Sequence, residues 1–200
     1  MFTLGKNPSN KPLKVEEDED GCCVESSGSR ILFYSEVTKD SVLSLNKMLR
    51  DIAIKQITLG ATHEIPPPPI KLHINSPGGS LLDGFAAVDY IRGCKVPVST
   101  IVDGSAASAA TLMSVVATGK RYINKHGYML IHQLSGGVWG KYEDMVDDFK
   151  NSTLFMETIY GIYREHTKIP EKTIKEMLKR DLWFDAKTCL KYGMVDEILA

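Results

Sequence analysis

The chain has 200 residues, 43% of them hydrophobic and 24% charged, so it can bury the core of one domain. Its formal net charge of -1 gives no electrostatic reason to bind nucleic acid. No segment has the roughly 18 apolar residues of a membrane span, and no Gly-x-x-x-x-Gly-Lys-Ser/Thr loop for ATP is present.

The four cysteines match neither a disulfide framework nor a metal site. Cys22 and Cys23 are adjacent, whereas Cys94 and Cys189 stand alone. We therefore expect reduced thiols in the cytoplasm or an equivalent reducing compartment. The histidines have no metal-ligand spacing, so no metal ion is expected. The N-terminus lacks an apolar run of about 7–15 residues, which argues against a secretory signal.

The first 29 residues differ in composition from the rest of the chain. They are polar and interrupted by prolines and glycines, and residues 16–20 are all acidic. Such runs are usually solvated and flexible. We therefore expect a flexible N-terminal segment over residues 1–29 and one folded domain over residues 30–200, which begins with a strand at 31–34.

The next elements are predicted from hydrophobic spacing. Apolar residues recur at helical intervals over residues 40–56, which indicates an amphipathic helix. Four prolines at 66–69 exclude a helix or a central strand, so they predict a stiff extended loop, with a proline-motif ligand as the alternative. Residues 70–74 alternate as a strand, and residues 82–91 follow a glycine turn as a helix.

The second half of the chain repeats this order. A strand over 96–102, a turn at Gly104 and a small-residue helix to about residue 117 precede a strand over 127–132. A long helix over 142–167, a shorter one over 170–180 and a last helix capped by Asp185 follow. Strands that alternate with helices predict an α/β domain with right-handed crossovers.

Ser108 follows a strand and a glycine turn and begins a helix. The free N–H groups and partial positive charge of a helix start favour negative charge that develops on an attacked carbonyl. Its alanine neighbours are small enough for a peptide backbone to approach. A simple N-cap is the alternative role for Ser108 or Ser105.

A glycine loop with the sequence Asn75-Ser76-Pro77-Gly78-Gly79-Ser80 joins a strand to a helix. Its paired glycines can adopt positive φ and leave their N–H groups unobstructed. Such a loop can donate hydrogen bonds to an oxyanion. An ordinary glycine turn is the alternative.

His132 and Asp181 complete a candidate catalytic set with Ser108. His132 ends an apolar strand and has the chemistry of a general base, although a structural histidine is the alternative there. Asp181 precedes apolar and aromatic residues, so it can be buried against aromatics and paired with the imidazole; a helix-end or surface aspartate is the alternative. Asp185 competes for this role, but a helix cap explains it. A serine, a base and its orienter are the chemistry of acyl transfer.

Four blocks of sequence, taken together and in order, resemble the Clp protease proteolytic subunit (ClpP) family over roughly residues 30–199. They are residues 74–79 (INSPGG), 104–108 (GSAAS), 119–121 with 129–133 (GKR and MLIHQ), and 180–181 with 192–196 (RD and YGMVD). The resemblance implies a ClpP/crotonase-like superhelix of repeated β-β-α units with a protruding long handle helix over 142–167.

The resemblance also implies roles for particular residues. Ser108 would be the nucleophile, His132 the general base and Asp181 its orienter. The oxyanion donors would be the N–H groups of Gly78 and Ala109. Residues expected beside an extended substrate are Gly79, Gly136 and Gly137.

The resemblance further implies an ATP-dependent Clp protease subunit that cleaves unfolded polypeptides inside two stacked heptameric rings. A partner AAA+ unfoldase would use the ATP, so no cofactor is expected in this chain, and no nucleic-acid or membrane partner. Residues 1–29 would supply axial loops and a propeptide candidate. Three departures from the family pattern are Ala109 and Ala110 after the serine, Leu134 after His-Gln, and the inserted proline loop.

Two other functions fit parts of the pattern. A non-catalytic Clp ring subunit would have no need for Ser108, His132 and Asp181 together. A crotonase-type acyl-CoA enzyme shares the fold and the backbone oxyanion hole, but it would not need this serine and histidine.

Overall fold

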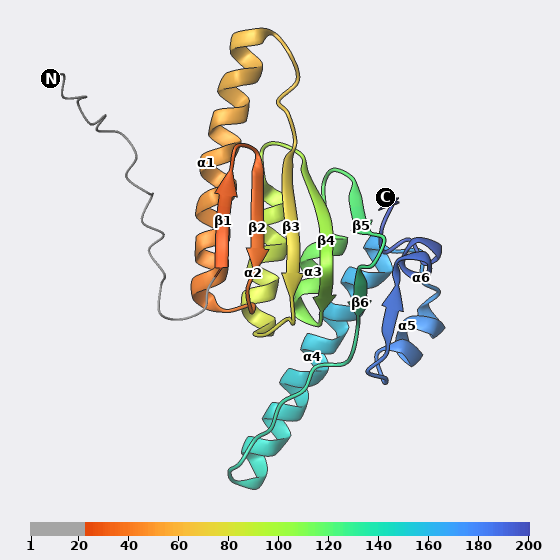
Figure 1. Ribbon diagram of the computed structural model, residues 1–200. Helices are drawn as coiled ribbons and strands as arrows, with labels where there is room; N and C mark the ends of the chain where they lie inside the picture. The colour runs from red at the N-terminus through yellow and green to blue at the C-terminus, as the bar shows by residue number, and fades with distance from the viewer. Residues whose placement is uncertain (1–22) are drawn as a thin grey trace, which may run out of the picture.

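The computed structural model describes residues 23–200 and has a mixed α/β fold (Figure 1). Eight strands of this part of the chain form one sheet. They are β1 (Cys23–Ser27), β2 (Arg30–Tyr34), β3 (Ile70–Ser76), β4 (Val98–Ala107), β5 (Arg121–Asn124), β6 (Tyr128–Leu130), β7 (Trp183–Asp185) and β8 (Glu197–Leu199).

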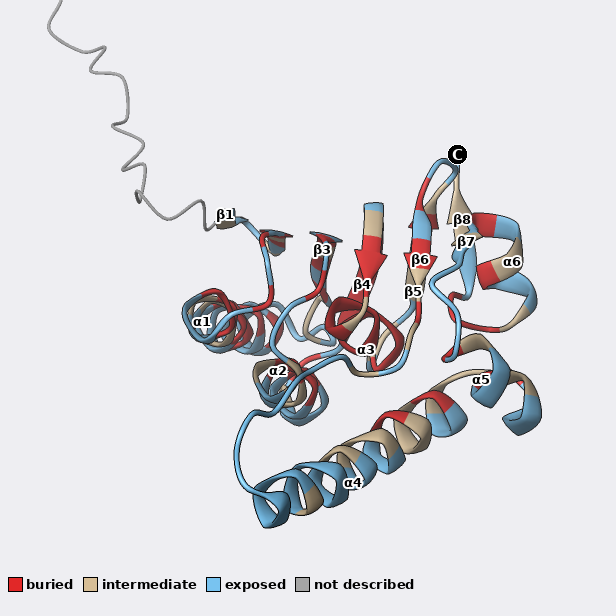
Figure 2. Cartoon of the chain, turned by 90° about the horizontal axis from the view of Figure 1, so that it is seen from below, coloured by how far each residue is buried: buried red, intermediate tan, exposed pale blue. Residues whose placement is uncertain are grey.

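The helices connect and cover these strands. They are α1 (Lys39–His63), α2 (Leu81–Gly93), α3 (Ala109–Val115), α4 (Tyr142–His166), α5 (Glu171–Met177) and α6 (Ala186–Lys191). Figure 2 shows α1, α2 and α3 together on one face of the sheet. Strands β2 to β5 and β8 run parallel with helices between them, so the predicted α/β class is confirmed.

The central strand β4 divides the sheet into two branches. Its first part pairs with β5 through Thr100–Val102, and its last part pairs with β6 through Ser105–Ala107. The turn predicted at Gly104 is wrong, because β4 continues through this glycine, which adopts a φ of 82°. The extra length carries β4 directly to Ser108.

The N-terminal boundary at residues 29 and 30 is also wrong. β1 pairs antiparallel with the whole of β2, from Cys23 opposite Tyr34 to Ser27 opposite Arg30. The turn between them uses Gly28 at a φ of 62°. An exposed edge strand lacks the apolar alternation that signals a strand, so composition alone assigned it to the flexible segment. Residues 1–22, which include the acidic run, lie outside the described residues.

The core lies between the sheet and its helices. Ile70, Leu72 and Ile74 of β3 are fully buried and alternate with more exposed residues, as the side-chain period of a strand requires. Ile31 and Phe33 of β2 point to the same side. Burial of each such side chain stabilises the fold by about 1.5–3 kcal/mol. This layer holds the carboxyl ends of β3 and β4 in place.

Two expected surface elements differ in length from their predictions. Helix α1 extends to His63, well past residue 56. The residue that caps it, Glu64, has a left-handed conformation with a φ of 55°. The prolines at 66–69 form no helix or strand and return the chain to β3, as expected. Helix α4 confirms the predicted long helix and ends one residue earlier, at His166.

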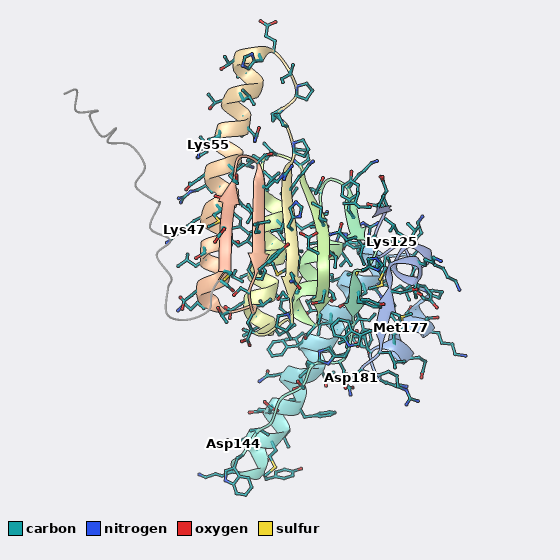
Figure 3. All side chains as sticks on the ribbon, in the orientation of Figure 1. Lys47, Lys55, Lys125, Asp144, Met177 and Asp181 are labelled. Atoms are coloured by element: carbon teal, nitrogen blue, oxygen red, sulfur yellow. The ribbon has the colours of Figure 1, made fainter. Side chains whose placement is uncertain are left out.

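Most of α4 projects away from the sheet (Figure 1). Only Ile159 and Tyr163, near its C-terminal end, are buried, whereas Phe149 is 75% exposed. At the far end, the Asp144 carboxylate accepts a hydrogen bond from the Lys141 N–H at 2.8 Å and so caps the helix. Asp144 is labelled there in Figure 3. The buried end of α4 therefore lies near Ser108, and the exposed end lies far from it.

Candidate active site

Ser108 lies at a tight turn between β4 and α3 in a strained backbone conformation. Its φ of 52° and ψ of -126° fall in a region that residues with a side chain rarely adopt. Its N–H donates to the Leu130 carbonyl at 2.9 Å, and its carbonyl accepts from the Thr111 N–H at 3.0 Å. The serine hydroxyl makes no capping bond, so the simple N-cap role is not observed.

Ser108 opens into a cavity of about 230 Å³ that it shares with His132. Ala109 and Gly79, two other residues singled out from the sequence, also line the cavity. Its remaining walls are Ser80, Leu81, Leu112, Gln133, Leu134, Ser135, Ile159 and Tyr163. The fold therefore brings a serine, an imidazole and a helix start to one site.

The glycine loop lies directly against Ser108. Gly78 has a φ of 93°, and a Cβ on it would lie 2.6 Å from both the Ala107 carbonyl oxygen and the Ser108 Cβ. The Gly78 carbonyl accepts from the Val37 N–H at 2.7 Å. Only glycine fits here, because a side chain would have to occupy the position of the serine.

The Gly78 N–H is engaged within the loop. It donates to the hydroxyl of Ser76 at 3.2 Å, and Ser76 is buried. The predicted positive φ of the paired glycines is confirmed, since Gly79 has a φ of 145°. To stabilise an oxyanion, the Gly78 N–H would have to leave the Ser76 hydroxyl and donate to the charged oxygen instead. This exchange is favourable because hydrogen bonds to charged acceptors are stronger than those to neutral ones.

His132 and Asp181 form a loose pair. His132 Nδ1 lies 3.4 Å from Asp181 Oδ1, which is longer than a tight charged hydrogen bond. The side chain of Asp181 is 82% exposed, so the burial against aromatics considered for it is not observed. Leu182 and Trp183 beside it are exposed as well, and leave the carboxylate uncovered. Figure 3 labels Asp181, which lies in the connection from α5 to β7.

Asp185 has the structural role expected of it. Its carboxylate accepts the Thr188 N–H at 2.8 Å at the start of α6. The hydrogen bonds from Thr188 hold the pKa of Asp185 below its usual value. Asp181 is therefore the aspartate that pairs with the cavity imidazole.

Gly136 and Gly137 lie away from the Ser108 cavity. Both are exposed and do not line it, and Gly136 lines an adjoining hollow against α4 with Phe149 and Met156. Residues 131–139 form no regular strand. No neighbouring strand of residues 23–200 pairs with this segment; the Leu134 N–H donates instead to the sulfur of Met156 at 3.3 Å.

Two cavity residues from α4 were not predicted as site residues. Ile159 and Tyr163 are the buried residues of a helix whose other side chains are largely exposed. The hydroxyl of Tyr163 is hydrogen-bonded to Thr111, and burial raises the pKa of this tyrosine. The one feature of the sequence that could have indicated them is the apolar stripe near the end of this long helix. Such a stripe predicts burial, but it does not predict which part of the protein covers the stripe.

A second, tighter histidine–aspartate pair lies on the sheet. His73 Nδ1 is 2.6 Å from Asp103 Oδ2, and the same carboxylate accepts from Tyr34 and Asn124. Burial opposes ionisation of Asp103, but the hydrogen bonds from His73 and Tyr34 prevail and lower its pKa. Burial and the neighbouring carboxylate raise the pKa of Tyr34 to about 12. None of these residues lines the Ser108 cavity.

The described residues show neither a metal-binding cluster nor a membrane-spanning helix. Among residues 23–200, no group of three or more His, Cys, Asp or Glu side chains is placed to hold a metal ion. No helix in this part of the chain combines the length and the apolar character of a membrane span.

The structure is a mixed α/β protein in which a strained serine at a strand-to-helix turn shares one cavity with an imidazole and lies against a glycine loop. The family model described as Clp protease matches residues 26–200. The chain therefore belongs to the Clp protease family.

Two curated relatives are similar over most of their length. An ATP-dependent Clp protease proteolytic subunit from Deinococcus radiodurans is 30% identical over 172 residues, which cover 83% of each chain. The ATP-dependent Clp protease proteolytic subunit 3 of Streptomyces coelicolor is 32% identical over 205 residues, with 99% of this chain and 91% of the relative covered.

Proposed function

We propose that this chain is the proteolytic subunit of an ATP-dependent Clp protease, a serine endopeptidase that cleaves unfolded polypeptides. The cavity that joins Ser108 to His132 is the observation that carries the proposal. The family match disfavours the crotonase-type alternative. A non-catalytic ring subunit is disfavoured because the chain retains Ser108, His132 and Asp181.

In the proposed mechanism, Ser108 Oγ attacks the peptide carbonyl while His132 removes its proton. The resulting oxyanion accepts hydrogen bonds from the N–H groups of Gly78 and Ala109. His132 then protonates the leaving amine, and water hydrolyses the acyl-enzyme by the reverse proton path. Gly78 must release the Ser76 hydroxyl in the first step, since its N–H donates to it at rest.

Asp181 is the proposed orienter of His132. A carboxylate at Nδ1 sets the tautomer that leaves Nε2 free to accept the serine proton, and it stabilises the imidazolium that follows. Its present distance of 3.4 Å and its exposure support a site that tightens when a neighbouring subunit covers Asp181 and the apolar residues beside it.

The proposed assembly is two stacked heptameric rings with the sites inside. Helix α4 would be the handle that joins the rings, because its exposed half carries apolar residues such as Phe149 and Leu154. The repeated β-β-α superhelix belongs to this proposal. A partner AAA+ unfoldase would consume ATP and feed the unfolded chain, so this subunit would need no cofactor.

The proposed substrate lies as an extended strand between two backbone segments. Gly79 would border it on one side and residues Gly136 and Gly137 on the other. The second segment would become a strand only when the substrate pairs with it. The three unpaired cysteines of the described chain are compatible with the proposed cytoplasmic or equivalent reducing compartment.

The proposed function is tested by covalent labelling of the purified protein with a fluorophosphonate, with the modified residue identified by peptide mass spectrometry. We expect the label on Ser108, and no label or peptidase turnover after Ser108→Ala. Unchanged turnover in Ser108→Ala would refute the nucleophile. A wild-type protein that forms rings but takes no label would support the structural ring subunit.

A further inference from the structure

A chain of hydrogen bonds links helix α4 to the backbone of Ser108. Thr111 Oγ1 donates to the Ser108 carbonyl at 2.6 Å, and the Thr111 N–H donates to the same oxygen at 3.0 Å. The hydroxyls of Thr111 and Tyr163 are hydrogen-bonded to each other. Because the single hydroxyl proton of Thr111 is used on Ser108, Tyr163 is the donor to Thr111.

Both hydroxyls are held where water does not compete. Thr111 is completely buried, and Tyr163 is 2% exposed. Burial raises the pKa of Tyr163, so the phenol keeps the proton that it donates. A linked pair of hydrogen bonds in such surroundings polarises each member, which strengthens the bond to the Ser108 carbonyl.

The Ser108 carbonyl shares one peptide unit with the Ala109 N–H. This unit is planar and trans, so the direction of the carbonyl determines the direction of the N–H. The preceding peptide is held by the bond from the Ser108 N–H to Leu130. Both peptides that flank the strained serine are therefore anchored, one by the sheet and the other by Thr111.

We propose, on the basis of the proposed protease function, that Thr111 is a positioning residue for the oxyanion-binding peptide and that Tyr163 holds it in place. The Thr111 hydroxyl directs the Ala109 N–H toward the oxyanion. Tyr163 makes this alignment depend on the position of α4, because the phenol moves with that helix. The direction of the Ala109 N–H therefore depends on the position of α4, a helix whose other end is exposed and available for assembly.

Four variants of the full-length, assembled protein test the proposal. Thr111→Val removes the hydroxyl at nearly constant volume, and Thr111→Ser retains it. Tyr163→Phe removes only the outer hydroxyl. The double variant Thr111→Val with Tyr163→Phe removes both hydroxyls, so that no buried side-chain donor is left without a partner. For each, the rate of fluorophosphonate labelling at Ser108, the kcat and KM for a peptide and the urea midpoint are measured.

We expect Thr111→Val to slow labelling and to lower kcat about tenfold, with KM unchanged. Complete loss of an oxyanion donor lowers kcat by about 10²- to 10³-fold. The effect expected here is smaller because the Ala109 N–H is still present and is only misdirected. Thr111→Ser restores most of the rate. Tyr163→Phe slows labelling about two- to threefold by loss of one supporting hydrogen bond. The double variant regains the urea midpoint but keeps the slow labelling.

Two results would overturn the proposal. The first is a folded Thr111→Val or double variant that labels at the wild-type rate, which would leave Thr111 with a structural role alone. The second is a wild-type rate in Tyr163→Phe, which would remove the link to α4. If the wild-type protein itself takes no label at Ser108, the proposed function fails instead, and the two failures are distinguished.

Discussion

The imidazole of His132 lies 3.4 Å from the carboxylate of Asp181, and that carboxylate is 82% exposed. The much tighter pair of His73 and Asp103, at 2.6 Å, lies elsewhere on the sheet. A tight histidine–aspartate contact is therefore not what distinguishes the proposed active site. The proposed site is distinguished by a cavity that the imidazole of His132 shares with Ser108.

Asp181→Asn tests the loose pair. We expect kcat to fall by about 10²- to 10⁴-fold, because an amide at Nδ1 favours the wrong imidazole tautomer. Peptidase assays and ring mass are measured together. Asp185→Ala is the matched control, since Asp185 caps α6 and does not pair with the imidazole. It should lower the melting temperature and leave kcat within about twofold. Equal losses of kcat in both variants would contradict the assignment.

Gly78→Ala tests the close approach of the glycine loop. A Cβ at this position would lie 2.6 Å from the Ser108 Cβ, so we expect peptidase activity and labelling to be lost. The control is Gly28→Ala. Its φ is 62°, and an added Cβ would have no atom within 4 Å other than those of Gly28 and its two chain neighbours. Its strain should cost about 1 kcal/mol in the free energy of unfolding without a change in kcat. Normal labelling of a folded Gly78→Ala variant would show that the loop is not part of the oxyanion site.

Asp103→Asn tests the polar cluster on the sheet through pH. The pKa of Asp103 is lowered in the folded protein, so its carboxylate stabilises the fold above its unfolded pKa, near 4, and this stability is lost as pH falls through the folded pKa. Urea unfolding at pH 3 to 7 should therefore show a flatter acid slope in the variant. An unchanged slope would contradict the pKa direction.

Tyr34→Phe tests the alkaline side of the same cluster. The folded pKa of Tyr34 is raised to about 12, so the neutral phenol stabilises the fold below the unfolded pKa of about 10, and this stability is lost as pH rises through 12. The variant should lose less stability than the wild type between pH 10 and 12. Peptidase activity at pH 7 should be unaffected, because the cluster does not line the cavity.

Phe149→Asp tests the exposed half of α4. Phe149 is 75% exposed, so the substitution should not unfold the subunit, but a buried charge would disrupt an interface formed there. We expect the mass from light scattering to fall and turnover to fall with it. Glu143→Gln on the same helix is the control, since its first turn is already capped by Asp144. A full-size, active assembly of Phe149→Asp would remove α4 from the interface.

Local sequence predicted a helix, strand or cap correctly where a single physical cause determines that element. Alternating apolar residues predicted β3, a long helical stretch predicted α4, and Asp185 was recognised as a cap because aspartate is favoured at the start of a helix. The short strands β5, β7 and β8 and the exposed edge strand β1 were missed. They are only three to five residues long, too short for a recognisable alternation, and exist because a neighbouring strand pairs with their backbone.

The sequence by itself determined the α/β order of the chain, its membership of the Clp protease family and the choice of Ser108, His132 and the glycine loop as candidate site residues, because these depend on residue types at short spacing. Only the tertiary structure decided how they meet. The strain at Ser108, the exposure of Asp181 and the bond from Tyr163 to Thr111, 52 residues apart, all depend on how α4 and the C-terminal elements pack against the sheet. Such packing balances many weak contacts over long separations, and no local pattern of residues encodes it.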